Sequence, residues 1–307
     1  MLEWNTLLSM SRQDVHLLHK ITYYPNQPKG TQPIAIIPRL SPLILHGITI
    51  GKGAKNMAEK FVTDPKDAIA NQREVLKALG MAPLEESFLI LTPKNGDINI
   101  FDVTNEEVAK AKARPNERPD VETVIHASFI ATDRRGIPLL TKAADCPTVF
   151  MHAKGTNGQN VIALLHSGRD ETEYMAPTQA ISHLQTRYGC DPQMITLGVA
   201  PSIGMSHYPI KKKNIKSETN PQGVISLENS FWKSFMQEGS VEGENVVFLD
   251  VCGNVIAQFL EAGVHESNIY LYDLDIFALA QNGMAFSHRY SQQTGFPGGR
   301  IMVVAQL

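Results

Sequence analysis

Two apolar runs in the middle of the chain are too close together to form parallel strands. The segment "PTVFMHA" is followed by the turn-forming stretch "KGTNGQ" and then by "NVIALLH", which ends at His166. Parallel neighbours need a crossover connection of about a dozen residues or more, usually a helix. The short glycine-containing connection therefore predicts an antiparallel hairpin, and the sheet that contains it must be at least partly antiparallel.

Amphipathic helices alternate with further apolar runs on both sides of this hairpin. The segments "DPKDAIANQREVLKALG", "PTQAISHLQTRYG" and "DVCGNVIAQFLEAG" each combine a helix-starting residue, apolar residues at helical spacing and a terminal glycine. The runs "SFLILT", "MITLGVA", "VVFLDV" and "IMVVAQL" are typical of buried strands. We expect an α/β protein of the layered α+β type, with mixed, partly antiparallel sheets and flanking helices.

The size and charge of the chain limit its organisation and its partners. A chain of 307 residues with no internal change in composition is expected to form one domain, 1–307. The net charge of −3, without a long basic stripe, argues against nucleic acid as a partner. No apolar run approaches the length of a membrane span, so no membrane partner is expected. Three widely spaced cysteines and no signal peptide indicate free thiols in a cytoplasmic protein, active as a monomer or homodimer.

Cys146 and His166 stand at the two ends of the predicted hairpin. Pairing that is symmetric about Thr156 would place the two residues directly opposite each other, with Cβ atoms about 5 Å apart. Two interpretations stay open at this point: an ordinary buried cysteine that fills space, or a thiol–imidazole site. Asp145 and Arg169 flank the pair and add polar groups at the strand ends.

An ordered series of segments resembles the polyphenol oxidase or laccase-domain family of the YfiH type. "TKAADCPTVFM" is similar to the family's T-A-D-C-x-P-V strand, and "VIALLHSGR" to its V-x-x-x-H-A-G-W-R-G segment. "LGVAPSIGMSHYPI", "FSHRY" and "GGRIMVVAQL" resemble later family motifs in the same order, and "LHGITIGKG" resembles an early one. The resemblance leaves residues 1–40 as a divergent N-terminal segment.

The resemblance implies a fold of the YfiH type, which is related to that of the cytotoxic necrotizing factor toxins, and a zinc-dependent enzyme. Members act on purine nucleosides by phosphorolysis and by deamination of adenosine, so a purine nucleoside and phosphate are the implied small-molecule partners. Their zinc ion is held by the histidine of a Q-V-H-G motif, the cysteine of A-D-C and the histidine of H-A-G-W-R-G. The last two positions fall on Cys146 and His166. With Asp145 and Arg169, they form the expected catalytic set.

This sequence departs from the family motifs at several positions. The Q-V-H-G position is "TPKN", which puts Lys94 where the first zinc-binding histidine is expected, and a protonated lysine has no lone pair for a metal ion. His126, His46 and His207 are the candidate substitutes for that ligand. The residues expected to bind substrate are His46, Lys52, Lys94, Arg289 and Arg300.

Two other functions remain open from the sequence. In a metal-free thiol hydrolase or deamidase, Cys146 would be the nucleophile and His166 the base, as in deamidases that act on a protein glutamine. In that case Lys94 would lower the pKa of the thiol if it lay beside the pair. The remaining alternative is a non-catalytic relative that serves as a binding module.

Overall fold

Three β-sheets and seven α-helices form the described part of the protein. The structure is a computed structural model and describes residues 15–25, 32–91, 98–112, 122–217 and 219–307. The predicted single domain of mixed α/β type is confirmed. The helices of these residues are α2 (Pro65–Ala78), α3 (Asn105–Lys112), α4 (Arg169–Glu173), α5 (Ala176–Tyr188), α6 (Val251–Glu261), α7 (Ile276–Gln281) and α8 (His288–Thr294).

The two larger sheets contain both parallel and antiparallel neighbours, as predicted, and the three-stranded sheet is antiparallel throughout. The strands of the seven-stranded sheet are, in spatial order, β1 (His16–Leu18), β14 (Ile269–Tyr272), β10 (Thr196–Val199), β8 (Thr148–Lys154), β9 (Asn160–His166), β6 (Phe129–Thr132) and β4 (Ile100–Asp102). The five-stranded sheet has the order β2 (Leu45–Ile48), β15 (Ile301–Gln306), β7 (Leu139–Ala143), β3 (Phe88–Leu91) and β5 (Thr123–His126). The three-stranded sheet has the order β11 (Pro209–Lys211), β13 (Glu244–Leu249) and β12 (Met236–Val241).

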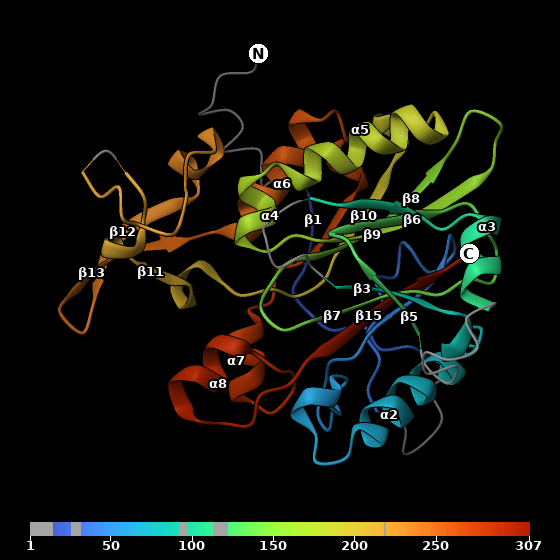
Figure 1. Ribbon diagram of the computed structural model, residues 1–307, viewed down its shortest axis with the longest axis horizontal. Helices are drawn as coiled ribbons and strands as arrows, with labels where there is room; N and C mark the ends of the chain where they lie inside the picture. The colour runs from blue at the N-terminus through green and yellow to red at the C-terminus, as the bar shows by residue number, and fades with distance from the viewer. Residues whose placement is uncertain (1–14, 26–31, 92–97, 113–121, 218) are drawn as a thin grey trace.

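The two larger sheets stack face to face between layers of helices. In Figure 1, α5 and α6 lie above the seven-stranded sheet, and α2 lies below the five-stranded sheet. One apolar cluster, which includes Phe88, Phe150 and Val303, fills the space between the sheets. Two further clusters join the outer helices to the sheets, through Leu184 of α5 and Leu76 of α2 among others. The arrangement buries both faces of the central strands.

The three helices expected from the sequence form where their capping residues indicate. The side chain of Asp64 accepts the Lys66 N–H at 2.9 Å and caps α2, and Asp250 accepts the Gly253 N–H at 2.8 Å and caps α6. Helix α5 ends at Gly189, whose φ of 68° lies in the left-handed region. A glycine adopts this conformation without the steric cost that a Cβ imposes.

The predicted hairpin is confirmed as β8 and β9, but its register differs from the expected one. Thr148, and not Cys146, is the partner of His166. The turn is centred on Asn157 because the Gly155 N–H donates to the Gln159 carbonyl at 2.9 Å and Gly158 adopts a φ of 76°. The expectation that Cys146 faces His166 directly is therefore wrong by two residues. An even shift keeps both side chains on the same face of the sheet.

The three-stranded sheet projects from the side of the stacked sheets (Figure 1). Glu173, the last residue of α4, holds the chain that leads into β12: its carboxylate accepts the Trp232 Nε1–H at 2.6 Å, the Ser226 hydroxyl at 3.0 Å and the Glu228 N–H at 2.8 Å. Charge-assisted hydrogen bonds of this kind are stronger than neutral ones. Helix α4 is thereby fixed at the base of the projecting sheet.

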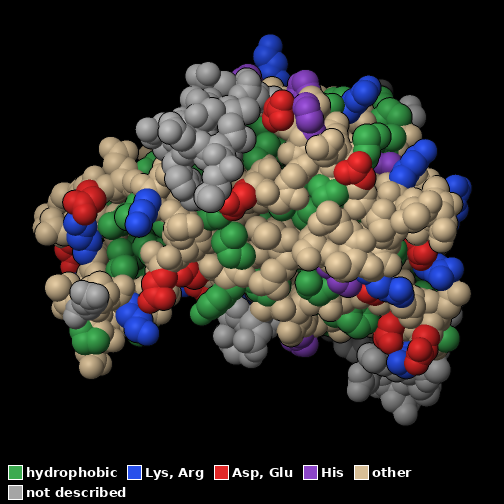
Figure 2. Space-filling model, turned by 90° about the horizontal axis from the view of Figure 1, so that it is seen from above, with side chains coloured by type: hydrophobic (Ala, Val, Ile, Leu, Met, Phe, Trp, Pro, Cys, Tyr) green, Lys and Arg blue, Asp and Glu red, His purple; other side chains and the backbone are tan. Residues whose placement is uncertain are grey.

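The surface carries charges of both signs. On the face in Figure 2, the described Lys and Arg side chains are interspersed with Asp and Glu side chains. In the parts of the chain that the structure describes, no helix is both long and apolar enough to cross a membrane.

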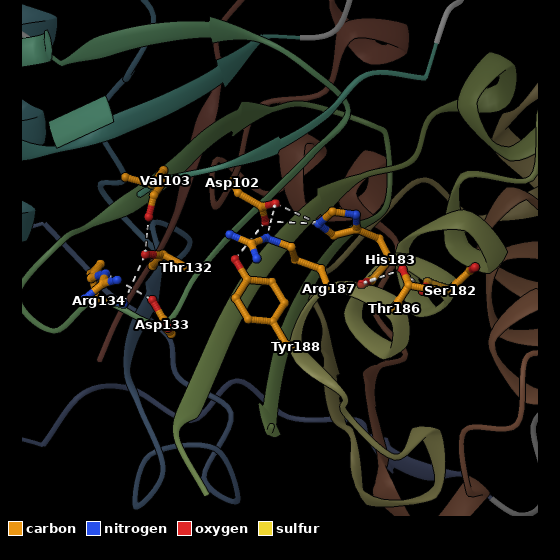
Figure 3. Close-up of polar contacts among 10 residues, drawn as sticks. All are labelled: Asp102, Val103, Thr132, Asp133, Arg134, Ser182, His183, Thr186, Arg187 and Tyr188. Atoms are coloured by element: carbon orange, nitrogen blue, oxygen red, sulfur yellow. Dashed lines mark hydrogen bonds and ion pairs between the residues drawn. The ribbon is translucent and has the colours of Figure 1, made fainter. Parts of the chain in front are cut away.

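The edge strand β4 is tied to helix α5 by one carboxylate (Figure 3). Asp102 accepts a hydrogen bond from the Tyr188 hydroxyl at 2.7 Å, lies 3.0 Å from His183 Nε2 and lies 3.4 Å from Arg187 Nε. Strand β4 pairs only with β6 among the described strands, so these side-chain contacts supply much of its attachment.

Removal of the tyrosine hydroxyl is expected to weaken this attachment. Tyr188→Phe should lower the free energy of unfolding by about 2 kcal/mol, because a hydrogen bond to a charged acceptor is lost. Arg187→Ala, which removes an ion pair whose arginine side chain is 54% exposed, should cost less than about 1 kcal/mol. Urea denaturation measures both values, and equal losses would show that the Tyr188 hydrogen bond has no special weight.

Candidate functional site

Cys146, His166 and Glu171 come together around Gly168. Pairing of the hairpin continues beyond β8 and β9, because the Ser167 N–H donates to the Pro147 carbonyl at 2.9 Å. This places Cys146 across from Gly168. A Cβ atom at Gly168 would lie 2.8 Å from Glu171 Oε2, 3.0 Å from Cys146 Sγ and 3.6 Å from His166 Cε1. The absent glycine side chain thus leaves a small cradle that a thiol, an imidazole and a carboxylate surround.

The surroundings of Cys146 keep its thiol protonated. Burial is the main cause that raises the pKa of Cys146 to about 12, and the nearby carboxylates of Glu171 and Asp145 contribute to this rise because they repel a thiolate. Burial lowers the pKa of His166 below its ordinary value. At neutral pH the pair therefore consists of a neutral thiol and a neutral imidazole, whose ring retains one nitrogen lone pair.

The pair opens into a cavity of about 430 Å³ with a cationic wall. Arg300 precedes β15, and Arg289 and His288 lie at the start of α8. The Arg289 guanidinium stacks over the Tyr208 ring at 4.7 Å, which fixes its plane. Burial lowers the pKa values of Arg300 and His288. The residues that line this cavity are Lys142, Ala143, Ala144, Asp145, Cys146, His166, Tyr208, His288, Arg289, Gln292 and Arg300.

Asp145 connects the thiol to the cationic wall. Its Oδ2 accepts the Arg289 N–H at 2.9 Å, whereas its Oδ1 is buried without a hydrogen-bond partner among the described residues. Burial raises the pKa of Asp145, although the hydrogen bonds from Ser287 and the Arg289 N–H and the charges of His288 and Arg289 oppose the effect. A buried carboxyl oxygen without a partner is costly to maintain, and a ligand in the cavity would relieve that cost.

Three of the expected residues lie elsewhere or outside the described chain, and a fourth, Arg169, lies beside Cys146 but does not line the larger cavity. His46 is 2% exposed in the core, where its Nε2 accepts the Ile37 N–H at 2.7 Å and its Nδ1 lies 3.3 Å from the Ile44 carbonyl. Burial lowers the pKa of His46 to about 4. Lys52 is exposed in the loop after β2 and does not line the cavity. Arg169 lies beside Cys146, where both residues line a separate pocket of about 20 Å³, and its guanidinium forms an ion pair with Asp170. Lys94 lies outside the described residues.

The other candidate histidines are also away from the pair. His126 is exposed at the end of β5, and His207 Nδ1 lies 2.5 Å from Asp275 Oδ2 while its ring stacks on Phe277. Neither lines the cavity of Cys146. Across the described ranges, no three His, Cys, Asp or Glu side chains are gathered closely enough to hold a metal ion as they are placed. Cys146 and His166 thus supply two metal donors, with the Glu171 carboxylate 4.0 Å from His166 Nδ1.

The sequence interpretation missed Glu171 and much of the cavity wall. Glu171 follows His166 by only five residues, and the single helical turn of α4 brings its carboxylate back over Gly168. An acidic residue one turn after a glycine at a strand end was the available signal. His288 and Tyr208 give no such signal, because they reach the site from distant parts of the chain.

Comparison with known proteins agrees with this fold. Residues 52–306 match the family model described as multi-copper polyphenol oxidoreductase laccase. The structure of YlmD from Geobacillus stearothermophilus is similar, with 20% identity and a TM-score of 0.67 over 94% of this chain and 99% of that one. The hypothetical protein YfiH of Bacillus licheniformis has 17% identity and a TM-score of 0.68 over 92% and 100% of the two chains. Comparison with proteins of curated function gives no match. Since the family model covers most of the sequence, the chain belongs to the laccase-like family of the YfiH type.

Proposed function

We propose that this protein is an enzyme that acts on purine nucleosides of the adenosine type, with phosphate as the second substrate. The observation that supports the proposal is the shared cavity: the Cys146–His166 pair and four further basic side chains, Lys142, His288, Arg289 and Arg300, line one space. A cavity of about 430 Å³ is within the usual range for a small-molecule site. The resemblance to nucleoside-cleaving members of the family supplies the substrate class.

The basic wall is suited to phosphate. Arginine guanidinium groups bind phosphate oxygens through paired hydrogen bonds, and Arg289 is held in a fixed plane by Tyr208. In phosphorolysis a phosphate oxygen forms a bond to C1′ of the ribose while the bond from C1′ to the purine nitrogen breaks. The electron pair of that bond goes to the purine, which then takes up a proton. Arg289 and Arg300 would bind and orient the attacking phosphate.

Asp145 is the group that best meets the need for a proton donor. It lines the same cavity as the thiol and Arg289, and burial raises its pKa, so it binds a proton more readily than an exposed aspartate does. When it carries a proton, Asp145 would donate it to the departing purine nitrogen. The deaminating branch of the family chemistry needs an activated water, and a zinc ion bound by Cys146 and His166 would supply that activation.

Loss of either arginine should affect phosphate more than nucleoside. With adenosine or inosine and phosphate, Arg300→Gln and Arg289→Gln should each raise the KM for phosphate and lower kcat/KM at least tenfold, equivalent to about 1.4 kcal/mol of transition-state stabilisation. The lysine substitutions should recover part of the loss, because they keep the charge but not the paired hydrogen bonds. Chromatographic measurement of ribose phosphate and purine base provides the rates.

Arg73→Gln is the matched control, because that arginine pairs with Glu85 on the surface of α2. Its kinetics should equal those of the wild type. Purine release that does not depend on phosphate, or arginine variants that keep the wild-type KM for phosphate, would contradict the phosphate assignment.

The reactivity of Cys146 separates this proposal from a thiol hydrolase. A pKa near 12 in place of 9.0 leaves roughly a thousandfold less thiolate at pH 7.5. Chelator-treated protein should therefore be alkylated by iodoacetamide at Cys146 far more slowly than free cysteine, with a rate that rises as the pH increases above 9. Peptide mass spectrometry after timed quenching measures the rate. Rapid modification of Cys146 at pH 7.5 would favour the metal-free nucleophile instead.

A further inference from the structure

We propose that a second cavity, of about 590 Å³, binds a linear alkyl polyamine. This acidic cavity is lined by residues that follow β10 and β14, by the start of α6 and by one residue each of β12 and β13. Its volume is within the usual range for a small-molecule site. Neither Cys146 nor His166 lines it, so the proposal goes beyond the proposed function and does not depend on it.

The acidic cavity lies at the carboxyl ends of two parallel strands. Strands β10 and β14 are parallel neighbours, and the connection between them includes α6. The lining residues 202–206 follow the end of β10, and the lining residues 273–275 follow the end of β14. Ligands commonly bind in the crevice outside the carboxyl ends of such strands, because the loops and helix starts that follow the strands meet there. The fold thus brings distant segments around one space.

Three carboxylates and no basic side chain line the acidic cavity. The acidic residues are Asp250, Asp273 and Asp275, and its described lining includes no Lys, Arg or His. The basic groups beside them in the described chain are His207, whose Nδ1 lies 2.5 Å from Asp275 Oδ2, and His19, whose Nδ1 lies 3.6 Å from Asp273 Oδ2. A wall of this charge repels phosphate and other anions and attracts organic cations.

The helix N-termini at the acidic cavity do not cancel its negative charge. Asp250 caps α6 by accepting the Gly253 N–H at 2.8 Å, and Asp275 caps α7 by accepting the Phe277 N–H at 2.9 Å. The N-terminus of a helix carries roughly half a positive elementary charge, whereas an ionised aspartate carries a full negative charge. The balance at each cap therefore stays negative, and an ammonium group of a ligand is attracted to both.

A buried hydroxyl in the same wall gives independent support for a ligand. Ser202 lines the cavity and is only 6% exposed. Its carbonyl accepts the Ile276 N–H at 2.9 Å, but its hydroxyl forms no hydrogen bond with another described residue. Buried polar groups in proteins are normally hydrogen-bonded. An ammonium group in the cavity would donate to this hydroxyl as well as to the carboxylates.

Apolar side chains line the rest of the acidic cavity. They belong to Ile203, Met205, Phe248, Leu271 and Leu274. A hydrated inorganic cation would leave these surfaces unused, whereas methylene groups would contact them and release water. Because the three carboxylates come from separate segments of the chain, several ammonium groups spaced along a flexible carbon chain match them better than one does. These are the features of a linear alkyl polyamine.

Calorimetric titration of the full-length protein with spermidine tests the proposal. Wild-type protein should bind one spermidine per chain and should not bind octanediol, an uncharged chain of similar length. Asp273→Asn should weaken spermidine binding about threefold, the usual effect of a partly exposed ion pair. The double variant with Asp250→Asn should weaken it at least tenfold, and asparagine retains the cap of α6. A roughly tenfold rise in salt concentration should also weaken binding.

Asp67→Asn is the matched control, because Asp67 is an exposed carboxylate in the first turn of α2 and its substitution changes the net charge equally. It should bind spermidine as the wild type does. Ser206→Arg should abolish binding, because Ser206 lines the cavity and the introduced guanidinium would pair with the carboxylates. Circular dichroism checks folding. If the double variant does not fold, Asp273→Asn and Ser206→Arg decide the question.

Wild-type protein that binds no spermidine, or aspartate variants that bind it with unchanged affinity, would overturn the assignment. Equal weakening by Asp67→Asn would also overturn it, because spermidine would then be attracted to the acidic surface in general. The titration contains neither nucleoside nor phosphate. Failure to cleave nucleosides would therefore count against the proposed function and leave the polyamine site standing, and failure to bind spermidine would remove the site and retain the function.

Discussion

The antiparallel pairing of β8 and β9 is the constraint on which the site depends. The ladder runs from Asn160 to His166 and continues through the hydrogen bond between Ser167 and Pro147. Since this last bond lies beyond the regular strands, it brings two loops together at the ends of two central strands, where side chains can contact a ligand. The register then decides that Cys146 faces a glycine and not a histidine. Because glycine has no side chain, this register lets the Glu171 carboxylate approach Cys146 beside Gly168.

The charges around Cys146 are divided between two sides. Glu171 and Asp145 surround the thiol and oppose its ionisation, while Arg289 and Arg300 form the wall of the larger cavity. A site of this kind is poorly arranged for a free thiolate, which needs nearby positive charge. The wall with the two arginines is better arranged to bind an anion such as phosphate.

Local patterns in the sequence predicted local structure. The parts of the site that come from distant segments could be predicted only from the family resemblance or seen only in the structure. Helices α2, α5 and α6 follow from capping residues and helical spacing, and the hairpin follows from its short connection. The register predicted for the hairpin was wrong by two residues, because the sequence of the turn does not show which residue lies at its centre. Arg289 and Arg300 were expected from the family resemblance alone. His46 lies in the core, where the Ile37 N–H donates to its ring, and no sequence pattern indicates such a contact.

The departures from the family motifs near His166 have a structural setting once the fold is known. In the ungapped comparison with H-A-G-W-R-G, the last three motif positions are Arg169, Asp170 and Glu171, which lie in the single turn of α4. Because α4 is anchored through Glu173, this turn holds the Glu171 carboxylate 4.0 Å from His166 Nδ1. The same carboxylate raises the pKa of the Cys146 thiol, so the sequence of α4 helps to keep that thiol protonated.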